Sequence, residues 1–188
     1  MAANPPARHP QAPASGAALP SHYDRCFGCG VDHPAGLGIE LFAGEGVSVT
    51  GRYRVAETQQ GAPGIAHGGI LAAVMDELLG SLNWLLMAPA VTYRLETVFR
   101  RPVPVAAELF LAARVVSVTG ATVHSEGEGR LDGPDGPVAV RAVGEFRQVP
   151  AEHFRRHGRP QDVASATGRP PWRDGPVTRG SFGPPVPE

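Results

Sequence analysis

Residues 64–86, GIAHGGILAAVMDELLGSLNWLL, form the most apolar stretch of the chain and limit its possible folds more than any other segment. Asp76 and Glu77 interrupt the stretch near its middle. Its length approaches that of a membrane span, but these carboxylates and Asn83 would be costly in lipid. The pattern therefore predicts a helix over about residues 68–86, buried on most sides in a soluble protein.

Short alternating segments on both sides of this helix predict β-strands joined by turns. Two strands are expected before the helix, within residues 36–55. Four are expected after it, within residues 90–99, 106–118, 121–131 and 138–149. Strands in series with short turns form an antiparallel sheet, and an apolar helix needs a curved sheet as its cover. The expected fold class is α+β, with an antiparallel sheet wrapped around one long central helix.

The two ends of the chain differ from its middle in composition. Residues 1–21 are rich in proline and alanine and residues 156–188 in proline and glycine, so both are predicted to be disordered tails. Residues 22–155 are predicted to form one folded domain. The net charge of −1 argues against a nucleic-acid-binding protein. Two closely spaced cysteines and the absence of a visible secretory signal favour a cytoplasmic location.

Over residues 26–148 the chain resembles the hotdog-fold acyl-CoA thioesterases. The resemblance lies in QGAPGIAHGGILAAVMDELLG, VTYRLETVFRRPVP and the upstream CFGCGVDHPAGLGIELF. The combination of a His-Gly-Gly motif, an aspartate nine residues after its histidine and a downstream strand ending in Arg-Pro resembles the phenylacetate-pathway-type subgroup of the 4-hydroxybenzoyl-CoA thioesterase superfamily. The resemblance implies a hotdog fold and hydrolysis of an acyl-CoA substrate to a free acid and coenzyme A. It implies no cofactor.

The resemblance also assigns roles to four residues. Asp76 matches the carboxylate that acts as general base or nucleophile, and Gly68 matches the glycine whose N–H binds the thioester oxygen. Thr92 matches the hydroxyl that positions water, and His67 matches a histidine that orders the turn. Gly61 stands where a common variant of the family has asparagine, so the chain follows another subtype.

These residue types suit thioester hydrolysis. Unpaired N–H groups in the first turn of a helix can stabilise an oxyanion, and Gly68 and Gly69 allow a substrate to approach the backbone. Gly69 is therefore a candidate substrate-binding residue. Burial is expected to raise the pKa of Asp76 toward the range useful for a general base. Glu77 is the second candidate acid, although its spacing from the histidine does not match the family.

The spacing along the helix predicts an oligomer. Gly68 and Asp76 lie about 12 Å apart along one helix axis, yet both are needed beside one small reacting group. Two antiparallel helices related by a two-fold axis meet that requirement, as the resemblance also implies. The expected assembly is a homodimer with two shared sites, which can pair further into a tetramer. Arg100 and Arg101 are candidates for binding coenzyme A phosphates, although a solvated sheet edge is the usual explanation for such a pair.

Other interpretations of these residues stay open. Strict alternation places Tyr93 and Leu95 on the apolar face of their strand with Val91 and Phe99, and Thr92 on the opposite, solvated face. His22, Cys26, Cys29 and His33 offer the ligand types of a zinc site, but the family resemblance carries no metal role, so no metal is expected.

The alternative function is a non-catalytic hotdog module that binds an acyl thioester. The buried carboxylate of Asp76 counts against it, since a pure binder has little use for such a group. A hydratase would instead need a catalytic histidine paired with the aspartate.

Overall fold

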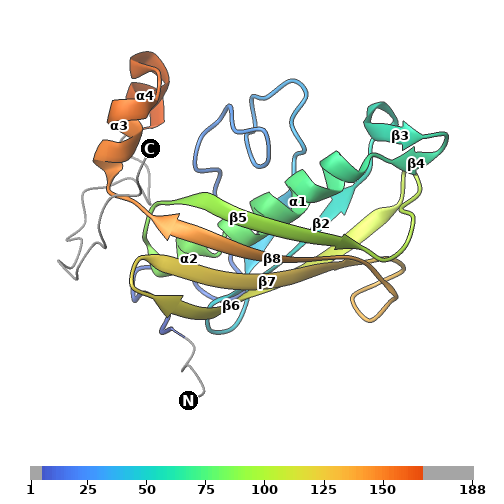
Figure 1. Cartoon of the computed structure of the whole chain (residues 1–188), viewed down its shortest axis with the longest axis horizontal. Coiled ribbons are helices and arrows are strands. Elements are labelled where there is room, and N and C mark those ends of the chain that lie inside the picture. The colour runs from blue at the N-terminus through green and yellow to red at the C-terminus, as the bar shows by residue number, and fades with distance from the viewer. Residues whose placement is uncertain (1–5, 167–188) are drawn as a thin grey trace.

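The computed structural model describes residues 6–166 and contains one six-stranded sheet packed on one main helix (Figure 1). Its strands are β1 (Glu40–Ala43), β2 (Ser48–Arg54), β5 (Ala90–Phe99), β6 (Glu108–Thr119), β7 (Thr122–Arg130) and β8 (Val138–Gln148). Their order is β1-β2-β6-β7-β8-β5, and every neighbouring pair is antiparallel. This is the hotdog fold, which confirms the expected α+β class.

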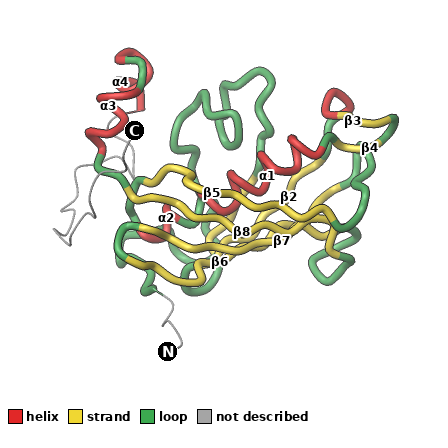
Figure 2. Tube along the Cα trace, viewed as in Figure 1, coloured by secondary structure: helices red, strands yellow, loops and turns green. Residues whose placement is uncertain are grey.

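The main helix, α1 (Gly68–Gly80), runs along one face of the sheet (Figure 2). The side chains that it buries are Leu71, Val74, Met75, Leu78 and Leu79. The segment Gly68–Leu86 is long and apolar enough to cross a membrane by length and composition, but 56% of its apolar window is buried inside the fold. The segment is apolar because it packs in the protein core, where a helix with apolar side chains on most sides has to be buried.

The predicted helix is interrupted before residue 86. The second part is a short helix, α2 (Asn83–Leu86), which follows α1 after a two-residue break. At the break the Ser81 hydroxyl donates to the Leu78 carbonyl oxygen, and the Asn83 amide donates to the Gly80 carbonyl oxygen. Such side-chain bonds compete with the regular helical ladder and explain why it stops here.

A small hairpin precedes α1 where a Gly/Pro loop was expected. After the 3-10 turn η1 (Glu57–Gln59), β3 (Gln60–Ala62) pairs with β4 (Ile65–Ala66). A Cβ atom on Gly61 would lie 2.7 Å from the Cα atom of His67. Glycine at this position therefore lets the hairpin pack directly against the start of the helix.

The two edges of the sheet differ in their surroundings. Residues 16–19 run along β1: the Gly16 amide donates to the Ala43 carbonyl oxygen, and the Leu19 amide donates to that of Leu41. Ala18 and Phe42 form an isolated bridge in the same place. Among residues 6–166, no comparable segment covers β5, which is the other edge strand.

The predicted tails contain ordered segments. Residues 6–21 fall in the expected N-terminal tail, but the part over β1 supplies backbone partners to an edge strand, a role that composition does not reveal. At the other end, α3 (Ala151–His157) and α4 (Pro160–Ala166) follow β8 and stand beside one end of the sheet (Figure 1). The Tyr23 hydroxyl donates to Asp162 at 3.0 Å. This bond joins α4 to residues 20–39, the segment before β1 that is called the leader from here on. Residues 167–188, the rest of the predicted C-terminal tail, lie outside the described residues.

Candidate active site

A carboxylate and a hydroxyl meet between α1 and the first residues of β5. The hydroxyl of Thr92 donates to Oδ1 of Asp76 at 2.9 Å. Asp76 lies near the middle of α1, one residue after the fully buried Met75, and its side chain is half-buried. Burial raises the pKa of Asp76, the hydrogen bond from Thr92 partly opposes that rise, and the nearby Cys26 adds to it. A carboxylate in this setting is poorly hydrated and is held in one orientation by its neighbour.

A β-bulge in β5 makes this contact possible. The pairing of β5 with β8 shifts between Thr92, opposite Phe146, and Arg94, opposite Glu145, so Tyr93 is an extra residue in the ladder. Because each extra residue reverses the alternation of side chains, Thr92 shares the helix-facing side with Leu95. The expectation from strict alternation, with Tyr93 and Leu95 on one face and Thr92 on the solvated face, was wrong. The Tyr93 side chain is 57% exposed, and its ring receives the Arg147 guanidinium at 4.9 Å.

The Asp76–Thr92 pair lines a cavity of about 370 Å³. Its walls come from the leader, α1, the break after it, α2, the start of β5, the end of β8 and α3. The lining residues include His22, Cys26, Glu77, Trp84, Phe146 and Phe154. Asn83 also lines it, and its Oδ1 atom is buried without a hydrogen-bond partner among the described residues. The cavity thus combines apolar and aromatic walls with a few polar atoms, which is typical of ligand sites. No sequence pattern pointed to Phe146 or Phe154, because they come from elements distant in the chain.

The start of α1 carries an amide with no acceptor. His67 is the N-cap residue, and its Nδ1 atom accepts the Gly69 N–H at 2.9 Å. The amides of Ile70 and Leu71 donate to the His67 carbonyl oxygen. In the described part of the chain the Gly68 N–H has no such partner. His67 therefore occupies the Gly69 amide and leaves that of Gly68 as the available donor at the positive end of the helix.

Within one chain the predicted site residues form two groups. Asp76 and Thr92 lie together at the start of β5, whereas Gly68 and the two arginines lie at its other end. Gly68 lies against the end of β5, since a Cβ atom there would be 3.5 Å from the Phe99 ring. Arg100 and Arg101 follow directly, and both amides donate to the Ala139 carbonyl oxygen. The wider hollow of about 670 Å³ that Arg100 lines opens on the sheet face away from α1 and contains neither Asp76 nor Thr92. We regard the smaller cavity as the candidate site because it contains the perturbed carboxylate and its partner.

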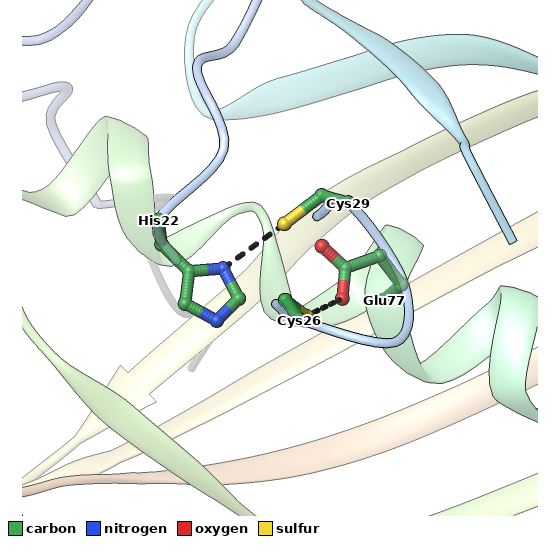
Figure 3. Close-up of side chains that lie close together, drawn as sticks. All are labelled: His22, Cys26, Cys29 and Glu77. Carbon is green, nitrogen blue, oxygen red and sulfur yellow. Dashed lines mark hydrogen bonds between the residues drawn. The ribbon is translucent and has the colours of Figure 1, made fainter. Parts of the chain in front are cut away.

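A second group of reactive side chains adjoins the cavity. His22, Cys26 and Cys29 of the leader gather around Glu77 of α1 (Figure 3). The Cys29 sulfur lies 3.2 Å from Nδ1 of His22, and the Cys26 sulfur lies 3.6 Å from Oε2 of Glu77. Burial, followed by the charge of Cys26, raises the pKa of Glu77 to about 7. The linear pattern groups the cysteines with His22 and His33 and makes Glu77 only a second candidate acid, whereas the structure keeps His22 and places Glu77 where His33 was expected.

Comparisons with known proteins find similarity to thioesterases. Residues 63–137 match the family model described as Thioesterase superfamily. A curated relative, acyl-coenzyme A thioesterase THEM4 of Bos taurus, is 34% identical over 84 residues, which cover 37% of this chain and 34% of the relative. The match thus spans about a third of that protein's length.

Two solved structures extend the comparison. A thioesterase superfamily protein is 28% identical, with a TM-score of 0.62 and coverage of 73% of this chain and 70% of its own. A Streptococcus mutans protein bound to acetyl-CoA is 16% identical, with a TM-score of 0.55 and coverage of 59% and 88%. The second likeness concerns the fold alone.

Proposed function

We propose that this chain, a member of the thioesterase superfamily, hydrolyses an acyl-CoA thioester to a free acid and coenzyme A. The observation that carries the proposal is the half-buried Asp76, bonded to Thr92 in the wall of a cavity inside a fold of this superfamily. A poorly hydrated carboxylate beside a hydroxyl is suited to activate water or to attack the thioester carbon itself. The narrower assignment to the phenylacetate-type subgroup stays a prediction.

The oxyanion that forms in the reaction needs a donor that one chain does not supply beside Asp76. Gly68 lies near the Phe99 end of β5, whereas Asp76 lies near its Thr92 end. If β5 pairs antiparallel with its own copy about a two-fold axis, the Phe99 end of one chain lies beside the Thr92 end of the other. The partner's Gly68 would then approach Asp76.

Two features of β5 support such a dimer. It is a ten-residue edge strand that nothing covers within residues 6–166, and natural proteins seldom leave so long an edge unpaired. Its exposed surface includes large hydrophobic side chains, with Tyr93 57% and Phe99 51% accessible. We therefore propose a homodimer in which each site takes its carboxylate from one chain and its amide donor from the other.

The direct test is a panel of acyl-CoA thioesters of different chain length and aromaticity, with release of coenzyme A followed by a thiol reagent. The proposal predicts turnover of at least one member of the panel. Calorimetric binding of an acyl-CoA without thiol release would favour the non-catalytic binding module. Neither binding nor release with any acyl chain would contradict both functions.

Replacing Thr92 with valine is expected to lower kcat by roughly 10- to 100-fold, the usual range for losing a hydrogen bond to a charged group. Valine keeps the shape of threonine but cannot donate to Asp76. Because the Thr92 hydroxyl lowers the pKa of Asp76, its loss should raise that pKa and move the acid limb of the pH–rate profile to higher pH.

The matched control is Thr92→Ser, which keeps the hydroxyl and should retain most of the activity and the original pH limb. Steady-state kinetics across a pH series would check both variants. If valine and serine lowered kcat equally and left the pH limb in place, Thr92 would have only a packing role.

A further inference from the structure

We propose that His22, Cys26, Cys29 and Glu77 bind one zinc ion that fastens the leader to the middle of α1. One ligand atom from each of the four side chains lies within 4.8 Å of all the others. This proposal does not depend on the thioesterase activity, because neither Asp76 nor Thr92 is among its four ligands.

The donor set matches the preferences of zinc. Zinc in closed structural sites is held tetrahedrally by four ligands drawn from thiolates, imidazoles and carboxylates, and Cys-x2-Cys is a usual spacing. Ligand atoms at usual zinc distances are about 3.3–3.8 Å apart. The 3.2 Å separation of Cys29 Sγ from His22 Nδ1 and the 3.6 Å separation of Cys26 Sγ from Glu77 Oε2 are already close to these values. The other ligand pairs lie within 4.8 Å, so they would have to move closer by up to about 1 Å to complete the tetrahedron.

The backbone of the leader is shaped to bring both thiols to one side. The Gly30 amide donates to the Cys26 carbonyl oxygen at 2.9 Å and closes a tight turn between the two cysteines. A Cβ atom on Gly30 would lie 2.4 Å from that same carbonyl oxygen, so a larger residue would force the turn open. At Gly28, within the turn, an added Cβ atom would collide with the Glu77 carboxylate. Because glycine has no Cβ atom, Glu77 has room to reach the thiols.

The charge balance at the cluster also favours a cation. Within residues 6–166 Glu77 forms no salt bridge, and its carboxylate instead faces two thiols. A divalent ion that binds here would displace the thiol protons, and the two thiolates and the carboxylate would then balance its charge. Both cysteines are free, so no disulfide satisfies them in this conformation.

The zinc ion would have a structural role with a consequence for the candidate site. With four protein ligands it has no open position for substrate, so it would serve to fix the chain. His22 and Cys26 line the same cavity as Asp76. Binding would therefore hold the leader in place as one wall of that cavity and would stabilise the fold through the leader–helix contact.

The test measures metal in the full chain, purified without a histidine tag and kept reduced in zinc-supplemented, chelator-free buffer, followed by dialysis. Elemental analysis should find about one zinc per chain. Cys29→Ser and Glu77→Gln should each weaken zinc binding roughly tenfold or more. His33→Ala is the matched control: it removes a histidine of the same leader that lies against Phe27 instead of in the cluster, and it should keep the full zinc content.

Three further measurements keep the test valid even if a variant misfolds. Cobalt added to the wild-type chain should give thiolate-to-metal charge-transfer absorption, and a strong chelator should lower the melting temperature of wild type but not of Cys29→Ser. Circular dichroism would establish that each variant is folded. Zinc content below about a tenth of an equivalent in reduced wild type, or zinc unchanged in both ligand variants, would overturn the proposal.

Discussion

Asp76→Asn is expected to lower kcat of thioester hydrolysis by about 100- to 10,000-fold, the range usual for losing a general base. Asparagine has almost the same shape and can still accept the hydrogen bond from Thr92, but it can neither take a proton from water nor attack the thioester. Since the substitution removes a charge that burial disfavours, the melting temperature should not fall. Thiol release with saturating acyl-CoA, together with a thermal melt, would check both statements.

The control for this variant is Asp135→Asn, the same chemical change at an exposed position in the turn before β8. It should leave kcat unchanged. An Asp76→Asn protein with undiminished turnover would remove Asp76 from the chemistry, and Glu77 would then be the acid to test.

Gly68→Pro is expected to lower kcat by about 100- to 1,000-fold, the usual effect of losing one oxyanion donor. Proline has no N–H, yet the first position of a helix tolerates it well. The preceding residue, His67, already has the extended conformation that proline requires, with φ of −67° and ψ of 133°. The atoms nearest to a Cβ atom at this position belong to the Phe99 ring, at 3.5 Å or more, which is ordinary contact distance.

Gly68→Ala is the matched control for Gly68→Pro, because it adds a side chain while keeping the N–H, and it should retain most of the activity. Equal losses in the alanine and proline variants would point to a steric cause and would remove the amide from the mechanism. Circular dichroism of both variants would establish that α1 is preserved.

The same two substitutions test whether the site is shared between chains. Co-expressed Asp76→Asn and Gly68→Pro chains should form mixed dimers in which one of the two sites is intact, restoring about one quarter of wild-type activity. A chain carrying both substitutions, paired with Asp76→Asn, should restore none. If mixed dimers formed but stayed inactive, the carboxylate and the amide would not be sharing a site across the interface.

Much of this fold follows from local pattern. The apolar residues of α1 and the alternation in the strands predict a helix on an antiparallel sheet, and the six main strands lie where the sequence places them. The start of α1 was also predictable, because a histidine before two glycines supplies a cap and an open backbone. What local pattern could not predict was the bulge at Tyr93, since an extra residue in one strand is defined only by its partner strand.

Only those parts of the candidate site that depend on local pattern could be predicted from the sequence. Asp76 stands out because a carboxylate in an apolar helix needs an explanation, whereas the position of Thr92 depended on the bulge. The grouping of Glu77 with the cysteines depended on how the leader crosses the helix, which no spacing along the chain encodes. His33 fitted the linear zinc pattern, but the turn at Cys26–Gly30 directs it elsewhere and brings Glu77 in its place.

The segment of residues 16–19 that runs along β1 has a consequence for how copies of this protein can associate. A sheet with two bare margins can add subunits at both sides and grow without limit into fibres. Here one margin is already occupied by the chain's own backbone, so residues 6–166 of each copy offer a single place for strand addition. Once two copies join there, neither has a margin left, and growth by strand addition ends at a closed pair.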